Sequence, residues 1–156
     1  MSIGEYLSDY RQEVDQFLDL VLPDIGVKPS SIHEATRYSV FAGGKRIRPI
    51  LAIATSEALG GKSVDVLPFA AALEMVHTYS IIHDDLPAMD DDDFRRGKLS
   101  THKKFNEATA ILAGNSLLTL AYEILTSKQL KLSDKVKTNL IQSLSVSVGR
   151  SGLAGG

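Results

Sequence analysis

The chain has 156 residues, the length of one domain, and its 44% hydrophobic content favours a folded globular protein over a disordered one. A formal net charge of −2 gives no long-range attraction to nucleic acid or to an acidic membrane surface, so we expect neither as a partner. The absence of cysteine excludes disulfide scaffolds and thiolate metal sites, and it is compatible with a reducing compartment.

The N-terminal residues carry no sign of export. Met1 is followed by Gly4, Glu5 and Asp9, without the basic and apolar regions of a signal peptide. No run reaches the ~20 apolar residues that a membrane span needs. We therefore expect a soluble, cytoplasmic protein.

Two helices are predicted first along the chain. Residues 3–22 place apolar side chains at steps of three and four, which indicates an amphipathic helix ending before Pro23. Ser31 and Glu34 match a capping box, so a second helix is expected from there to about Gly43.

Residues 43–49 read GGKRIRP. The glycines allow the backbone to approach a ligand closely, three cations follow, and Pro49 suits the first turn of a helix. Because helix N-termini attract anions, the segment predicts an anion-binding turn before a helix that ends near Leu59. The alternative is an ordinary basic turn.

The next predicted helix, residues 66–85, is apolar on most sides, as in a helix surrounded by neighbours. Glu74, His77, Ser80 and His83 recur every three residues, so they share one flank of this helix. His77 is therefore a candidate ligand contact, with an ordinary packed histidine as the alternative.

Residues 83–98 follow and read HDDLPAMDDDDFRRGK, with six aspartates between positions 84 and 93 and Arg95, Arg96 and Lys98 behind them. Close carboxylates repel one another unless cations lie among them, and oxygen ligands suit magnesium. One arginine can bind two phosphate oxygens at once. A diphosphate bridged by magnesium would therefore satisfy both the aspartates and the arginines of the segment. A solvated acidic loop is the alternative, but the position at the end of an apolar helix favours a site.

Two more helices are predicted, from about Ala108 to Leu125 and from Ser133 onward. The residues of the last helix that are expected to face inward are Val136, Leu140, Ile141, Leu144 and Val148. Without internal repeats or strand-like alternation, the pattern predicts an all-α fold.

Three motifs together resemble one enzyme family: GGKRIRP at 43–49, EMVHTYSIIHDDLPAMDDDDFRRGK at 74–98 and GLAGG at 152–156. They are similar to the polyprenyl (isoprenyl) diphosphate synthases, and most to the bacterial farnesyl diphosphate synthases. The resemblance implies an isoprenoid synthase-type helical bundle around an apolar cavity. It also implies head-to-tail condensation of isopentenyl diphosphate with an allylic diphosphate (dimethylallyl or geranyl) to give farnesyl diphosphate, using magnesium or, alternatively, manganese.

The resemblance also implies roles for individual residues. Asp84 and Asp90 are expected to ligate magnesium, with Asp85 as a supporting carboxylate, and Arg95 to hold the allylic diphosphate. The residues expected to hold the diphosphate of isopentenyl diphosphate are Lys45, Arg48, His77 and Arg96. These cations can meet only if the 43–49 turn packs beside the 84–98 loop.

Product length is expected to depend on Tyr79, five residues before Asp84 and about 7.5 Å from it along a helix. In similar enzymes an aromatic residue here accompanies a fifteen-carbon product, so we expect the Tyr79 ring to form the cavity floor. The alternative is that the ring points elsewhere.

Members of this family are about twice as long and carry a second aspartate-rich motif in their second half. Residues 1–156 are therefore expected to be the N-terminal portion of such a domain, inactive alone. A half-domain should expose apolar surface and associate, as a homodimer or with the missing half.

Other functions explain less of the sequence. His83 and Asp84 suggest an HD-type phosphohydrolase, which leaves GGKRIRP and DFRRG unexplained. An EF-hand does not fit, because the register that places Gly97 at the sixth loop position begins at Asp92 and puts Phe94, Arg96 and Lys103 at the ligand positions 3, 5 and 12. A non-catalytic fragment that binds magnesium and diphosphate, or that needs a partner chain, stays open as the alternative.

Overall fold

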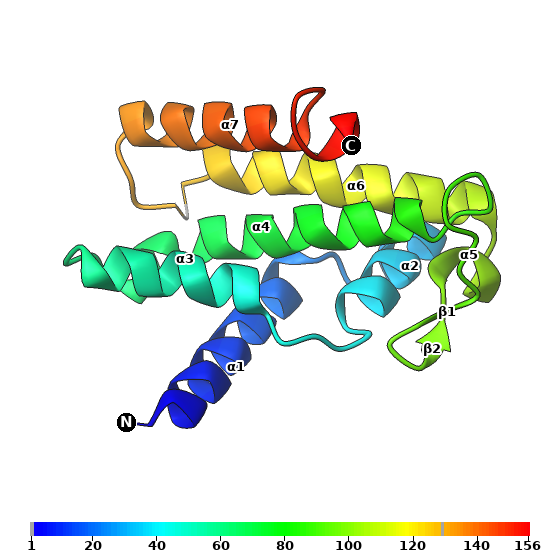
Figure 1. The fold of residues 1–156 in the computed structure, drawn as a ribbon, viewed down its shortest axis with the longest axis horizontal. Helices are drawn as coiled ribbons and strands as arrows, with labels where there is room; N and C mark the ends of the chain where they lie inside the picture. Colours follow the sequence, from blue (N-terminus) through cyan, green and yellow to red (C-terminus); the bar gives the residue numbers. More distant parts are fainter. Residues whose placement is uncertain (1, 129) are drawn as a thin grey trace.

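The computed structural model describes residues 2–128 and 130–156, which form a bundle of helices (Figure 1). The elements in chain order are α1 (Ile3–Val21), α2 (Ser30–Val40), α3 (Ile47–Ala58), α4 (Ser63–Asp84), β1 (Phe94–Arg95), β2 (Lys98–Leu99), α5 (Thr101–Lys104), α6 (Glu107–Thr126), α7 (Asp134–Val148) and the 3-10 helix η1 (Leu153–Gly155). The all-α prediction is confirmed. The short hairpin, in which β1 pairs antiparallel with β2, was not predicted.

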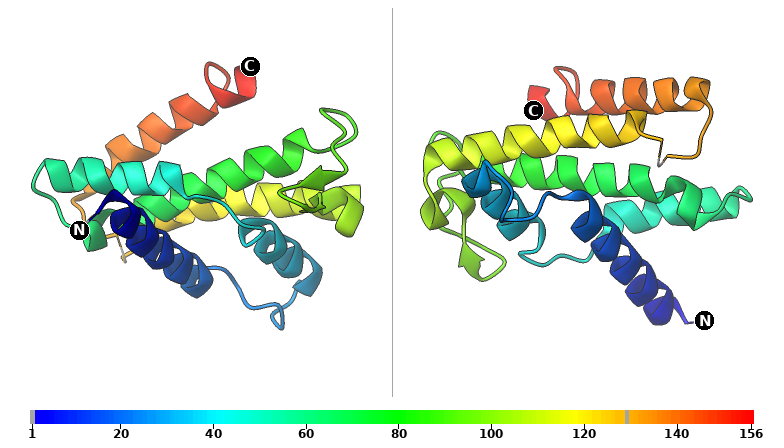
Figure 2. Two further views of the ribbon diagram at one scale, coloured as in Figure 1. Left: turned by 60° about the horizontal axis from the view of Figure 1, so that its bottom comes forward. Right: turned by 180° about the vertical axis from the view of Figure 1, so that it is seen from behind.

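Helix α4 is the centre of the bundle, with α3 along one side and α6 along the other (Figures 1 and 2). Buried alanines on both α4 and α6 let these helices approach closely, because their side chains end at Cβ. At Gly114 even a Cβ would lie 2.4 Å from the His83 Nε2, so this crossing requires glycine. The prediction that this central helix is covered on most sides is confirmed by its ten buried residues.

Helix α1 crosses the bundle beside α3 and α4 and is tied to α3 by two tyrosines. The Tyr6 hydroxyl donates to the Glu57 Oε2 at 2.7 Å, and the Tyr10 hydroxyl donates to the other carboxylate oxygen. The hydrogen bond to Glu57 raises the pKa of Tyr6 to about 12, because it holds the phenol proton. These bonds fix the first half of α1 against α3.

Helix α7 packs on the outer side of α6 (Figure 1). Leu144 is the only residue of its apolar stripe that is fully buried, and Val136 is 41% exposed, so the prediction that Val136 faces inward is wrong. The reason is that α7 has α6 as its main neighbour, which covers only one side of the helix. Apolar surface stays exposed on α6 and α7, as at Leu112 and Val146.

The predicted capping box at Ser31 is also wrong. Helix α2 begins at Ser30 after Pro29, without a side-chain cap, so Ser31 already lies inside the first turn. A capping box occurs instead at the start of α1, where Ser2 and Glu5 bond reciprocally.

Among the described helices, α6 alone is long and apolar enough to cross a membrane, which the sequence did not predict. Core helices of folded proteins can meet the same criterion, and 39% of the relevant window is buried within the bundle. Its neighbours are α2, α4, α5 and α7.

Candidate functional site

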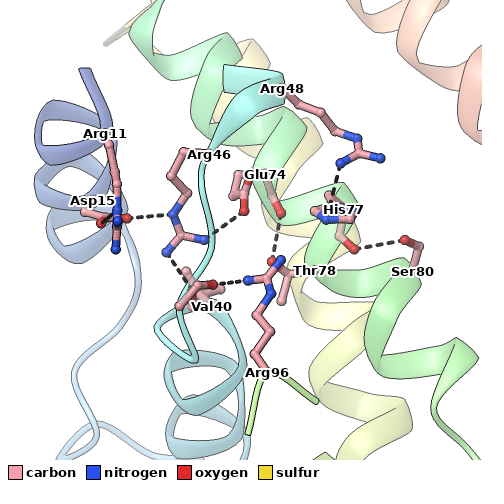
Figure 3. A network of polar contacts seen from close by, with 11 residues as sticks. Arg11, Asp15, Val40, Arg46, Arg48, Glu74, His77, Thr78, Ser80 and Arg96 are labelled. Atoms are coloured by element: carbon pink, nitrogen blue, oxygen red, sulfur yellow. Dashed lines mark hydrogen bonds and ion pairs between the residues drawn. The ribbon is translucent and has the colours of Figure 1, made fainter. Parts of the chain in front are cut away.

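The basic turn between α2 and α3 is held by the guanidinium of Arg46, which bonds to residues of three helices (Figure 3). Arg46 is buried, with 3% of its surface exposed. Its Nε donates to the Asp15 Oδ1 of α1, and its Nη1 donates to the Glu74 Oε1 of α4, each at 2.7 Å. Its Nη2 donates to the Val40 carbonyl at 2.7 Å. Arg46 therefore joins α1, α2 and α4, and all three of its nitrogens are committed.

Sequence reasoning grouped Arg46 with the other cations of the turn and assigned it no structural role. The sequence contains only part of the information needed to foresee this role. Glu74 lies on the polar flank of α4, but nothing in the sequence pairs it with Arg46.

Beside this buried arginine lies a pocket of about 570 Å³. It combines the 43–49 turn, the middle of α4 and the tip of the β1–β2 hairpin. The residues that line it are Arg11, Ala42, Gly43, Gly44, Lys45, Arg46, Ile47, Arg48, Glu74, His77 and Arg96. We call it the basic pocket. The four residues that the family resemblance assigned to isopentenyl diphosphate, Lys45, Arg48, His77 and Arg96, all line it.

The hairpin reaches this pocket through Arg96, which lies near Val40 and Thr78 in Figure 3. The Arg96 Nη1 donates to the Gly43 carbonyl. Gly44 has a φ of +143°, and a Cβ there would lie 2.6 Å from the Arg96 Nη1 and 3.4 Å from the Arg46 Nη1. Gly44 is therefore packed between two guanidinium groups, and any side chain would have to displace one of them.

Positive backbone φ angles occur both in the basic pocket and in the aspartate loop. Among the described residues, Arg46, Asp91 and Arg96 are the non-glycine residues with positive φ, at 52–54°. Such a conformation costs about 1 kcal/mol or more for a residue with a side chain, and it persists where the surroundings hold it. The hydrogen bonds described above hold Arg46 and Arg96 in this conformation.

His77 faces the basic pocket from α4. The Arg48 Nη1 lies 3.3 Å from the His77 Nε2, and because a guanidinium can only donate, Nε2 is the acceptor and the proton is on Nδ1. Burial lowers the pKa of His77, the positive charge of Arg48 lowers it further, and the Glu74 carboxylate partly opposes this shift. The free pocket thus holds a neutral imidazole among cations.

The aspartate-rich segment begins where α4 ends. Asp84 is the last residue of α4, and the Asp90 amide donates to the Asp84 carbonyl at 2.8 Å. This bond closes the loop, so Asp84 and Asp90 become neighbours with exposed side chains. Both carboxylates lie near the negative end of the α4 dipole, which adds to their attraction for a cation.

Asp85 is buried, with 2% of its surface exposed, whereas the neighbouring Asp84 is exposed. The Arg95 Nε donates to the Asp85 Oδ1 at 3.0 Å, and the Arg95 Nη2 donates to Asp85 and, at 2.6 Å, to the Asp92 Oδ2. Arg95 is thereby oriented by two carboxylates. Its Nη1 makes none of the hydrogen bonds found within residues 2–128 and 130–156, so it can donate to a ligand.

The acidic side chains do not form a complete protein cage for a metal. In the described part of the chain, no group of three or more histidine and carboxylate side chains converges on one point. Magnesium is usually held by one or two carboxylates together with water and substrate phosphates, and Asp84 and Asp90 fit that mode. The donor set therefore suits a magnesium ion that a diphosphate helps to bind.

Tyr79 lies on α4 between His77 and the aspartates and packs partly buried against the core. Its ring meets the His83 ring edge to face, with centroids 4.7 Å apart. The His83 Nε2 lies 3.2 Å from the Ile111 carbonyl of α6, to which it donates, beside Gly114. The Tyr79 ring is thus fixed at the α4–α6 contact.

Comparison with known proteins agrees with this geometry. The polyprenyl synthetase family model matches residues 29–149. The chain is similar to the farnesyl diphosphate synthase of Micrococcus luteus, at 57% identity over 81% of this chain and 43% of that protein. It is also similar to the enzyme of the same name from Geobacillus stearothermophilus, at 43% identity over 100% of this chain and 52% of that one.

The fold agrees as well. An FPP/GFPP synthase from Zymomonas mobilis, solved as an apo structure, superposes with a TM-score of 0.93 at 38% identity, covering 97% of this chain and 55% of that one. The chain thus spans about half the length of the proteins it matches.

The packing of Gly44 predicts a selective loss of anion binding in Gly44→Ala. The new methyl group displaces Arg96, so we expect inorganic pyrophosphate to bind about tenfold more weakly in calorimetry. A loss of this size corresponds to one charge-assisted hydrogen bond. Gly43→Ala is the matched control, because Gly43 also has a positive φ of 104° but no atom within 4 Å of its Cβ position. Equal losses in the two variants would contradict the packing role of Gly44.

The environment of His77 predicts a pKa below 6.5 in the free protein and a rise when pyrophosphate binds, measured by the NMR titration of its ring protons. Because the unfolded chain then takes up the proton more readily than the folded one, the free energy of unfolding should rise with pH up to about 6.5. That slope should shrink in His77→Gln. A free-protein pKa above 6.5 would contradict the buried, neutral assignment.

Proposed function

The chain belongs to the polyprenyl synthetase family, and we propose that its two charged regions hold the two diphosphates of a head-to-tail prenyl transfer. The observation that carries the proposal is the convergence of Lys45, Arg48, His77 and Arg96 on one pocket. Arg96 directly follows Arg95, which is bonded to Asp85 of the aspartate-rich segment. The substrates are isopentenyl diphosphate and an allylic diphosphate, and the product is farnesyl diphosphate.

The basic pocket would hold the diphosphate of isopentenyl diphosphate. Lys45 and Arg48 are exposed and line the pocket from the start of α3, while Arg96 lines it from the hairpin. The only carboxylate in the lining is that of Glu74, which is already neutralised by Arg46. The pocket therefore keeps an excess of positive charge for a polyanion.

The aspartate loop would hold the allylic diphosphate. Asp84 and Asp90 are the carboxylates that would bind magnesium, or alternatively manganese, and the metal supplies charge stabilisation to the departing diphosphate. Arg95, oriented by Asp85, would donate its Nη1 to the same diphosphate. Asp85 would act on the substrate only through Arg95.

In the transfer, the carbon–oxygen bond of the allylic diphosphate breaks and the double bond of isopentenyl diphosphate attacks the allylic carbon. Arg95 stabilises the negative charge that develops on the leaving group. The proton lost from the isopentenyl unit passes to the released diphosphate. The apolar faces of α4 and α6 exclude the water that would capture the allylic cation.

Because the chain spans about half the length of its relatives, we propose that these residues act as an N-terminal portion of a polyprenyl synthase domain. The remaining diphosphate ligands would come from a segment equivalent to the relatives' second half, on this or another chain. Dimer formation and a cytoplasmic location are part of the same proposal. The alternative is a non-catalytic protein that binds magnesium and diphosphate.

The test is prenyl transfer from geranyl diphosphate to labelled isopentenyl diphosphate with magnesium. Residues 1–149 would be joined to the remaining segment of the Micrococcus luteus farnesyl diphosphate synthase. We expect activity in this chimera and a loss of about 10- to 100-fold in Arg48→Gln, because a charged hydrogen-bond donor is removed. Lys135→Gln on α7 is the control for charge. An inactive chimera that still binds pyrophosphate would favour the non-catalytic alternative.

Tyr79 is proposed as the floor of the product cavity, supported by its fixed position at the α4–α6 contact. Tyr79→Ala should lengthen the product of the chimera by one or more isoprene units, because the ring no longer limits the growing chain. Tyr79→Phe keeps the ring and should keep the product. Unchanged chain length in Tyr79→Ala, read by product chromatography, would refute this role.

A further inference from the structure

We infer that Arg11 of α1 is an additional cationic contact for the diphosphate in the basic pocket, beyond the four residues assigned above. The inference rests on the proposed function. Arg11 lines the same pocket as Lys45, Arg48 and Arg96, although it lies more than 30 positions earlier in the chain. It is brought there by the packing of α1 against α3 and α4.

The Arg11 side chain is loosely held in the free protein. Among the described residues its one ion pair joins the Arg11 Nε to the Asp15 Oδ2 (Figure 3), at 3.9 Å, which is too long for a hydrogen bond. The Arg11 side chain is 53% exposed. The other Asp15 oxygen already accepts from the buried Arg46 at 2.7 Å. An exposed i,i+4 pair at this separation adds little to stability, so Arg11 can leave Asp15 at little cost.

The backbone of Arg11, in contrast, is firmly placed. Tyr10 is bonded to Glu57 of α3, and Asp15 is bonded to Arg46. Arg11 therefore lies between two anchored positions of one helix. A long cationic side chain on a fixed backbone, with a weak partner, can turn toward an anion without any change in the fold.

The charge balance favours that movement. Arg46 and Arg11 share the single carboxylate of Asp15, while Glu74 is committed to Arg46. Arg11 is thus incompletely neutralised beside a pocket already rich in positive charge. A diphosphate, with several negative charges, is a stronger partner for its five N–H donors than the shared carboxylate.

The experiment is calorimetric titration of inorganic pyrophosphate into the whole chain without divalent metal, at two or more salt concentrations. We expect Arg11→Gln to weaken binding by about 5- to 10-fold and to reduce the salt dependence, because one ionic contact is lost. Arg11→Lys should keep most of the affinity. Lys135→Gln removes a cation on α7 that does not line the basic pocket, so this variant should bind pyrophosphate like the wild type. Circular dichroism checks that each variant keeps its helices.

Two results would overturn the inference, and they can be told apart. If Arg11→Gln binds pyrophosphate as the wild type does while Arg48→Gln binds weakly, Arg11 is not a contact and the proposed pocket stands. If the wild-type chain binds no pyrophosphate, the diphosphate assignment of the basic pocket fails together with the role of Arg11.

Discussion

The structure around the site depends on the burial of one guanidinium. Arg46 is almost completely enclosed, and it is tolerable there only because Asp15, Glu74 and the Val40 carbonyl each accept one of its N–H groups. A buried ion pair adds little stability over apolar residues of the same size, but removing one partner costs about 3–5 kcal/mol. The cluster therefore matters less for stability than for arrangement, since its bonds form only when α1, the turn and α4 are in one relative position.

The placement of the other charges follows from this constraint. With Arg46 turned inward, its neighbours Lys45 and Arg48 remain outside and line the basic pocket. Helix α4 then links the two charged regions, because His77 and Asp84 are seven residues apart, about 10 Å along the helix. The hairpin adds consecutive arginines with different partners: Arg95 pairs with Asp85 and Arg96 bonds to the 43–49 turn. Under the proposed function, this arrangement would bring the two diphosphates close enough for their prenyl groups to be joined.

Much of this could be predicted from the sequence, and the exceptions have physical reasons. Apolar periodicity gave the long helices, and Ser133 was correctly expected to begin α7, where its side chain accepts from the Val136 amide. The convergence of Lys45 and Arg96 came from the family resemblance, since periodicity says nothing about which loops meet. The burial of Arg46 could not be foreseen, because neighbouring cations look alike until the fold shows which one meets Glu74. The exposure of Val136 depends on how few elements cover α7, which is a property of the whole bundle.

The Arg46 cluster holds the 43–49 turn against α1 and α4, and we expect it to position the anion pocket rather than merely to stabilise the chain. The most direct measurement is the affinity for inorganic pyrophosphate of the double variant Arg46→Met with Glu74→Leu, in which apolar side chains of similar size replace the buried ion pair. We predict that this variant unfolds cooperatively on heating and that its pyrophosphate affinity is about tenfold or more below that of the wild type. A folded double variant with wild-type affinity would contradict it, because the turn would then find its position without the buried arginine.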